Sequence, residues 1–132
     1  MRNYFVALVF FSKKEYFEIQ MSEKVLLTGV SGWIAKHVAI ELLNSGYEVL
    51  GTIRNKDLIE QTKQTLASQN VPLQKLSFVE LDLLRDAGWD EAARGCKYIM
   101  HVASPFPLKT SRNRESLVPA AKDGTLRVLM RE

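Results

Sequence analysis

The sequence predicts an α/β fold that forms the N-terminal part of a doubly wound parallel sheet, the Rossmann type of nucleotide-binding domain. Two observations carry this prediction. Segments with the apolar pattern of buried strands alternate with segments that have an apolar stripe at helical spacing, as in βαβ units with right-handed crossovers. In addition, the strand pattern at residues 25–28 turns through Gly29 and Gly32 directly into a helix pattern.

The turn in VLLTGVSGWIA (residues 25–35) has the features of a loop that holds a dinucleotide pyrophosphate. Gly29 permits the tight turn, and Gly32 lets the backbone approach a phosphate with no Cβ between them. The helix that follows offers unpaired N–H groups and the positive end of its dipole to an anion. We therefore expect a dinucleotide to bind at this strand–helix junction.

Strands and helices are expected in strict alternation. The strand patterns cover residues 25–28, 48–53, 76–81 and 97–102, and the helix patterns cover residues 33–44, 57–67, 89–93 and 117 to the end. Gly46 and Gly95 follow the first and third helices as stop signals, and Gly124 weakens the last helix. The residues expected to face inward are Ile34, Val38, Leu42 and Leu43 in the first helix, Leu58, Ile59, Thr62 and Leu66 in the second, and Leu117, Ala121, Leu126 and Leu129 in the last.

These strands and helices make only the first half, and little more, of a doubly wound domain. We therefore expect residues 21–132 to form a partial NAD(P)-binding Rossmann domain that is cut off before its second half.

Residues 1–20 are an atypical N-terminal extension. The apolar run YFVALVFF (residues 4–11) lies behind a single Arg2 and is followed by the charged stretch SKKEYFE. A signal-peptide core is disfavoured, because no small-residue cleavage site follows and the basic region is minimal. An added strand is a second alternative. We favour a third, in which the natural protein begins at Met21 and the preceding segment is an extension of it.

Composition excludes several classes of partner. The net charge of +3 is not arranged as a basic stripe with interleaved aromatic residues, so we expect no nucleic acid. No segment reaches transmembrane length, so we expect no membrane partner. Cys96 is the single cysteine, which excludes an internal disulfide and fits a reducing compartment such as the cytoplasm. The two histidines and the cysteine lack metal-site spacing, so we expect no metal.

The end of the second strand indicates which cofactor is preferred. An acidic residue at this position accepts hydrogen bonds from the ribose 2′-hydroxyl and favours NAD. This chain has Arg54 there, with Lys56 close by, and a guanidinium binds a 2′-phosphate in a bidentate way. The pattern therefore favours NADP over NAD, although Arg54 as a solvated charge at a strand end is the alternative. Asp57 lies beyond the strand end and is expected to cap the next helix.

The third and fourth strands also end in candidate site residues. Asp82 can accept a hydrogen bond from the adenine amino group while Leu83 packs on the ring, or Asp82 can cap the following turn. Small residues after the fourth strand let the backbone approach the nicotinamide side of the crevice. His101 lies inside a strand and is expected to be a packed, hydrogen-bonded histidine rather than a catalytic one. His37 is expected near the surface.

Five segments together resemble a known family. They are TGVSGWIAKH (residues 28–37), TIR (52–54), DL (82–83), HVASPF (101–106) and DGTLRVL (123–129). The chain resembles the extended short-chain dehydrogenase/reductases of the NAD-dependent epimerase/dehydratase superfamily. The similarity is closest to the dihydroflavonol reductase, cinnamoyl-CoA reductase and aldehyde or methylglyoxal reductase branch. It covers residues 23–129, and Ala35 in place of the third glycine is a departure that the family tolerates.

The resemblance implies a role for each matching residue. The pyrophosphate loop is formed by Gly29, Ser31, Gly32, Trp33 and Ile34, the 2′-phosphate site by Arg54 and Lys56, the adenine contacts by Asp82 and Leu83, and the path to the nicotinamide by Val102, Ala103 and Ser104. The reaction of the family is hydride transfer from NADPH to an aldehyde, ketone or CoA thioester. It is assisted by a Ser–Tyr–Lys set in which tyrosine donates the proton and lysine lowers its pKa.

That catalytic set is not assigned in this chain. The residues four positions after its tyrosines are Leu8, Gln20, Gly51 and Val102, and none is lysine. The family places the motif beyond Glu132. We therefore expect the cofactor-binding half of an NADP-dependent reductase whose complete enzyme acts on a small carbonyl substrate. The alternatives are a sugar-nucleotide epimerase or dehydratase fragment, against which Arg54 and HVASPF argue, and a truncated, non-catalytic dinucleotide-binding module.

Overall fold

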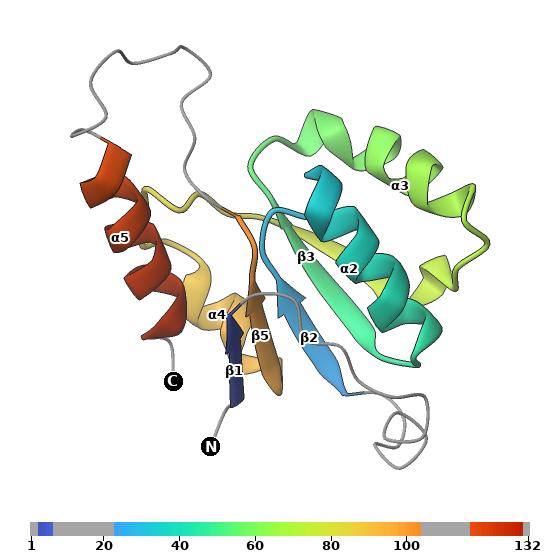
Figure 1. Ribbon diagram of the computed structural model, residues 1–132, viewed down its shortest axis with the longest axis horizontal. Helices are drawn as coiled ribbons and strands as arrows, with labels where there is room; N and C mark the ends of the chain where they lie inside the picture. The colour runs from blue at the N-terminus through green and yellow to red at the C-terminus, as the bar shows by residue number, and fades with distance from the viewer. Residues whose placement is uncertain (1–2, 7–22, 104–116, 131–132) are drawn as a thin grey trace.

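A parallel β-sheet forms the centre of the protein (Figure 1). The computed structural model describes residues 3–6, 23–103 and 117–130. Among these residues the sheet has five strands in the order β1-β5-β2-β3-β4. The strands are β1 (Asn3–Val6), β2 (Lys24–Leu27), β3 (Glu48–Ile53), β4 (Leu76–Glu80) and β5 (Tyr98–His101), and all neighbouring pairs are parallel.

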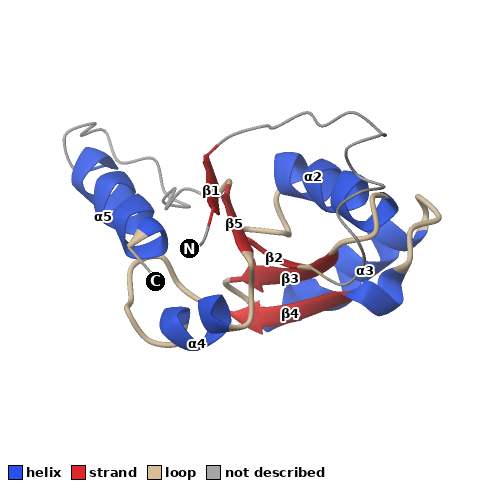
Figure 2. Cartoon of the chain, turned by 90° about the horizontal axis from the view of Figure 1, so that it is seen from below, coloured by secondary structure: helices blue, strands red, loops and turns tan. Residues whose placement is uncertain are grey.

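Helices cover both faces of the sheet, as parallel sheets require. Figures 1 and 2 show α2 (Trp33–Asn44) and α3 (Ile59–Ala67) on one face, with α4 (Trp89–Arg94) and α5 (Leu117–Leu129) on the other. Short 3₁₀ turns, η1 (Lys56–Leu58) and η2 (Leu73–Lys75), precede α3 and β4. The predicted α/β fold with a parallel, Rossmann-like sheet is therefore confirmed.

Two apolar clusters hold these layers together. Successive residues of a strand point to opposite faces, so Val25 and Leu27 pack with α2 and α3, whereas Leu26 packs with α4 and α5. The first cluster includes Val38, Ala39, Leu43 and Leu66, and the second includes Trp89, Ala92, Ile99 and Val128. Apolar packing therefore holds both faces of the sheet and leaves the carboxyl ends of its strands open.

The N-terminal strand β1 adds to the outer edge of β5. Its register aligns Asn3 with Tyr98 and Val6 with His101, in parallel orientation. The structure thus gives Asn3–Val6 a place in the sheet, which corresponds to the added strand and not to the alternative that the sequence analysis favoured for this segment. This strand covers the backbone edge of β5 that faces away from β2.

Helix α2 begins and ends at the expected residues, but one residue of its predicted inner stripe is wrong. Its buried residues are Ala35, Val38, Ala39 and Leu43, whereas Ile34 is 50% exposed. Ile34 lies in the first turn of the helix, at the open edge where the strands end, so its side chain is only partly covered. The predicted stop is confirmed, because Gly46 has a φ of +91° and its N–H donates to the Leu43 carbonyl.

The second predicted helix differs at its start. Residues 56–58 form the 3₁₀ turn η1, and as a result Leu58 is 38% exposed instead of facing inward. Asp57 does not cap α3. Instead, the Asn55 side-chain oxygen accepts a hydrogen bond from the Asp57 N–H at 2.9 Å and caps η1.

In the expected inner stripe of helix α5, Ala121 and Leu129 are half-buried, Leu126 is wrong, and the Leu117 side chain lies outside the described residues. Val128 and Gly124 are buried, whereas Leu126 is 45% exposed. The helix continues through Gly124, which is one of its buried positions. Arg127 helps to fix this orientation, because its guanidinium pairs with Asp86 and donates to the Leu83 carbonyl.

Candidate functional site

A cleft of about 570 Å³ lies at the carboxyl ends of strands β2 to β5. This is the position at which open α/β sheets bind their ligands. Its lining residues come from the ends of the strands, the turns that follow them and the first turn of α2: Gly29, Ser31, Gly32, Trp33, Ile34, Ala35, Thr52, Arg54, Leu81, Asp82, Leu83, Val102 and Ala103. The structure therefore brings together all the predicted site residues except Lys56, which lies outside the cleft on η1, and Ser104, which lies outside the described residues.

The turn between β2 and α2 is tied to the neighbouring strand β3. Gly29 adopts a φ of +70° and donates its N–H to the Thr52 hydroxyl at 3.0 Å. The next N–H, that of Val30, donates to the Thr52 carbonyl at 3.0 Å, and the Gly32 N–H donates to the Gly29 carbonyl at 2.9 Å. The loop is thus held in shape by β3 and by itself before any ligand arrives.

The two glycines of this turn serve different purposes. A Cβ at Gly29 would meet the Ala103 Cβ at 2.7 Å, so Gly29 is required for the close approach of β2 and β5. A Cβ at Gly32 would meet only the Gly29 carbonyl oxygen, at 3.2 Å. Gly32 is exposed and lines the cleft, so the space that its missing side chain leaves open belongs to the cleft.

The N-terminus of α2 is suited to an anion. Gly32 is the N-cap and no side chain caps the helix. The first turn also contains no acidic residue. The first N–H groups of a helix have no partner within it, and they carry the positive end of the helix dipole. Helix α2 therefore directs uncapped donors into the cleft, which fits a pyrophosphate.

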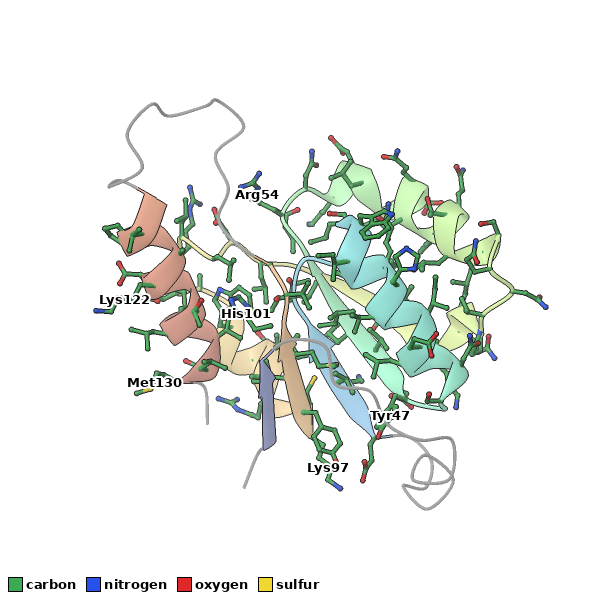
Figure 3. All side chains as sticks on the ribbon, viewed as in Figure 1. Tyr47, Arg54, Lys97, His101, Lys122 and Met130 are labelled. Atoms are coloured by element: carbon green, nitrogen blue, oxygen red, sulfur yellow. The ribbon has the colours of Figure 1, made fainter. Side chains whose placement is uncertain are left out.

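Arg54 supplies a positive side chain at the end of β3. It is exposed and lines the cleft, and it makes no hydrogen bond or ion pair with the described residues. In Figure 3 it projects beyond the carboxyl end of the sheet, whereas Tyr47 and Lys97 lie at the opposite end. An exposed guanidinium without a protein partner can bind a second phosphate of the ligand.

Asp82 and Leu83 follow β4 on the far side of the cleft. The Asp82 carboxylate accepts a hydrogen bond from the Leu84 N–H at 2.9 Å, so it caps the turn, as one of the two sequence interpretations held. Asp82 also lines the cleft, so the turn-capping role and a contact with a ligand are compatible. Leu83 is 8% exposed and packs in the second apolar cluster, which leaves a small apolar surface at this end of the cleft.

Val102 and Ala103 form the wall that follows β5. Their N–H groups donate to the Thr28 hydroxyl at 2.9 and 3.0 Å. His101, immediately before them, is 9% exposed and does not line the cleft. Burial lowers the pKa of His101 from its ordinary value of 6.5. The prediction of a packed, hydrogen-bonded histidine is therefore confirmed, and so is the surface position of His37.

Sequence reasoning missed Ala35, Thr52 and Leu81 as members of the cleft wall. Thr52 is the most informative of these, because it is 3% exposed yet carries a hydroxyl. A polar residue near the end of an otherwise apolar strand pattern was the available signal, and Thr28 at the end of β2 gives the same signal.

The described part of the chain contains neither a metal-binding cluster nor a membrane-spanning helix. No group of three or more His, Cys, Asp or Glu side chains there could hold a metal ion. No helix among the described residues is long and apolar enough to cross a membrane.

A parallel sheet with a glycine turn, an uncapped helix N-terminus and a cleft across its strand ends defines a dinucleotide-binding α/β protein. The model of the NAD dependent epimerase/dehydratase family matches residues 25–131. The chain therefore belongs to this family and lies in the reductase branch of the extended short-chain dehydrogenase/reductases.

Similar proteins of that branch include plant and yeast reductases. Tetraketide alpha-pyrone reductase 1 of Arabidopsis thaliana is 36% identical over 110 residues, which are 83% of this chain and 33% of the relative. Dihydroflavonol 4-reductase of Hordeum vulgare is 30% identical over 105 residues, which are 80% of this chain and 29% of the relative. The yeast methylglyoxal/isovaleraldehyde reductase complexed with NADPH has a TM-score of 0.65 and 27% identity, over 81% of this chain and 32% of that one. The chain thus spans about a third of the length of these relatives.

Proposed function

We propose that the chain is the NADP(H)-binding half of a carbonyl reductase, in which hydride passes from the nicotinamide to an aldehyde, ketone or related carbonyl. One observation carries the proposal: Arg54 and the uncapped N-terminus of α2, which can both bind phosphate, line the same cleft. The reductase relatives, one of them in complex with NADPH, support the type of reaction and the choice of cofactor.

The charges of the cleft favour the phosphorylated cofactor. The end of β3 lies beside the adenosine ribose in sheets of this type, where a carboxylate would repel a 2′-phosphate. Arg54 occupies that place, and its guanidinium can form two parallel hydrogen bonds with phosphate oxygens. Asp82 is the single acidic residue among those that line the described cleft. It follows β4, whereas Arg54 follows β3.

The remaining cleft residues suit the other parts of the cofactor. Trp33 and Ile34 are 76% and 50% exposed at the start of α2, beside the pyrophosphate position. Val102 and Ala103 are small enough to let the nicotinamide approach the end of β5, together with Ser104 by family resemblance. The described residues would thus bind and orient the dinucleotide, while the bound cofactor supplies the hydride.

The partner of the full reaction would be a small carbonyl compound. We also place the protein in the cytoplasm, because a single cysteine suits a reducing compartment. A non-catalytic dinucleotide-binding module remains a second candidate. In that case these residues bind the dinucleotide without the tyrosine–lysine motif, which none of their tyrosines provides.

Calorimetric titration of the full 132-residue chain with NADPH and with NADH tests the proposal. We expect both to bind at one site, with NADPH tighter. Tighter binding of NADH would overturn the cofactor assignment. No binding of either dinucleotide would overturn the proposed function as a whole.

A further inference from the structure

Thr28 and His101 form a buried hydrogen-bond network directly behind the wall of the cleft. Thr28 is fully buried, at the turn after β2, and its N–H donates to the Met100 carbonyl of β5. Its hydroxyl oxygen accepts from the Val102 N–H at 2.9 Å and the Ala103 N–H at 3.0 Å. The same oxygen lies 3.0 Å from Nδ1 of His101.

This geometry determines where the protons are. A hydroxyl oxygen has two acceptor positions and one hydrogen to donate. Both acceptor positions of Thr28 are used by backbone amides, so its hydrogen must point at Nδ1 of His101. Nδ1 is then an acceptor, and the proton of the neutral imidazole resides on Nε2.

The Nε2 side of the ring faces helix α5. Thr125 places its hydroxyl oxygen 3.3 Å from Nε2, where it can accept the Nε2–H. Figure 3 shows His101 between β5 and α5. The network therefore runs from α5 through His101 and Thr28 to the two amides that shape the cleft wall.

The wall has little freedom to move. A Cβ at Gly29 would lie 2.7 Å from the Ala103 Cβ and 3.2 Å from its Cα, so the pyrophosphate turn and the β5 end are in tight contact. A change in the hydrogen bonds of Ala103 would therefore alter the space at the glycine turn as well.

We propose that His101 is a positioning residue for the dinucleotide cleft: its neutral Nε2–H form orients the Thr28 hydroxyl, and Thr28 in turn holds the Val102 and Ala103 amides in the wall. The proposal rests on the proposed function in that the cleft is taken to bind NADP(H). The hydrogen bonds by which His101 controls the two backbone amides form without a ligand, so this part of the proposal does not depend on one.

Protonation of His101 would break this arrangement. Nδ1–H would become a donor that faces an oxygen whose acceptor positions are both filled, so Thr28 would release an amide or the ring would turn away.

The charged groups of α5 nearby are Lys122 and Asp123, both exposed, and Arg127, which pairs with Asp86. The turn after β2 contributes Thr28 at this level, and the register of β1 places Val6 beside His101, next to Phe5 and Tyr4. Burial is the one cause that lowers the pKa of His101, and none of these groups shifts it.

The tautomer is the first test, and it needs no ligand. Nitrogen-15 spectra of the full chain at neutral pH should show an unprotonated Nδ1 and a protonated Nε2 for His101. His37 is the other histidine, and the His37→Gln variant assigns the signals. A protonated Nδ1 in neutral His101 would overturn the proposal.

Two variants of the same position separate positioning from packing. His101→Asn places an oxygen acceptor where Nδ1 lies but cannot be protonated, whereas His101→Phe keeps a ring and has no acceptor. We expect amide hydrogen exchange at Val102 and Ala103 to be about tenfold faster in His101→Phe than in His101→Asn, the effect of leaving one buried hydroxyl without its acceptor. Equal protection in the two variants would overturn the proposal, and this readout stands even when no dinucleotide binds.

The pH dependence of NADP⁺ affinity tests whether the hydrogen-bond network of His101 affects the cleft. NADP⁺ affinity of the wild type, relative to His101→Asn, should fall as the pH drops below the ordinary histidine pKa of 6.5. At each pH the wild-type affinity is divided by that of His101→Asn, because the 2′-phosphate of the cofactor itself gains a proton at about pH 6 and affects both proteins alike. A ratio that stays constant from neutral pH to the acid limit of folding would overturn control of the cleft by His101. Failure of both proteins to bind at neutral pH would instead overturn the proposed function, with the exchange experiment still deciding on the positioning role.

Discussion

Gly29 and Ala103 are in contact so close that no side chain fits between them. A Cβ at Gly29 would lie 2.7 Å from the Ala103 Cβ, and Gly29 also has a φ of +70°. These two residues join the pyrophosphate turn after β2 to the wall after β5, which are 74 residues apart in the chain as positions 29 and 103. The cleft is therefore built on a backbone contact that requires glycine.

The first prediction concerns stability. Gly29→Ala should lower the free energy of unfolding by about 2–4 kcal/mol, because it combines a left-handed backbone with overpacking. Gly32→Ala is the matched control, since its Cβ would meet only one carbonyl oxygen, at 3.2 Å, with a φ of −74°. Urea unfolding of both variants checks the difference. Equal stability of the two would show that the turn relaxes and that the contact with Ala103 is not required.

The second prediction concerns the pyrophosphate. Gly32→Val should abolish NADPH binding while it changes stability little, because the branched side chain would occupy the place where phosphate meets backbone. We expect folding to tolerate the substitution because Gly32 is exposed in the cleft. Calorimetric titration measures the binding, and circular dichroism checks the fold. Near-normal affinity in a folded Gly32→Val protein would remove the pyrophosphate from this turn.

The third prediction concerns the choice of cofactor. Arg54→Asp should weaken NADPH by about 2–3 kcal/mol, or roughly 30- to 150-fold, and NADH far less, because a charge-assisted contact becomes a repulsion. Lys56→Asp is the control with the same change of charge, and Lys56 does not line the cleft. Its effect on NADPH should be smaller. Equal losses of NADPH and NADH affinity in Arg54→Asp would show that Arg54 does not contact the 2′-phosphate.

The order of elements could be predicted from the sequence because their signals are local. Helix α2 lies between the Gly32 turn and the Gly46 stop, and β3 has an uninterrupted strand pattern, so both have the predicted bounds. Most of the cleft residues were also predictable, because the ends of parallel strands meet at one edge of a sheet, although Ala35, Thr52 and Leu81 were not predicted. Lys56 is the exception among the described residues: the 3₁₀ turn η1 carries it out of the cleft.

Relations between distant segments could not be predicted in the same way. The bond between Thr28 and His101 spans 73 residues, and no periodicity reports it. In α5 the prediction placed Leu126 inside, whereas Val128 is the buried residue, and the contact of Arg127 with Asp86 and the Leu83 carbonyl accompanies this orientation. The pairing of β1 with β5 is likewise a long-range choice that the apolar pattern of residues 4–11 left open.

The last prediction concerns chemistry. The purified 132-residue chain should bind NADPH but catalyse no measurable reduction of aldehydes or ketones. None of its tyrosines has a lysine four residues later, so a general acid of the family type, which contributes about 10²–10⁴-fold, is missing. Exposed apolar residues on α5 and at its end, Val118, Leu126 and Met130, should also make the chain self-associate at high concentration. NADPH oxidation with a panel of aldehydes measures the first expectation, and size-exclusion chromatography measures the second. Turnover by a monodisperse chain would show that catalytic groups lie within these residues and that the cleft does more than bind the cofactor.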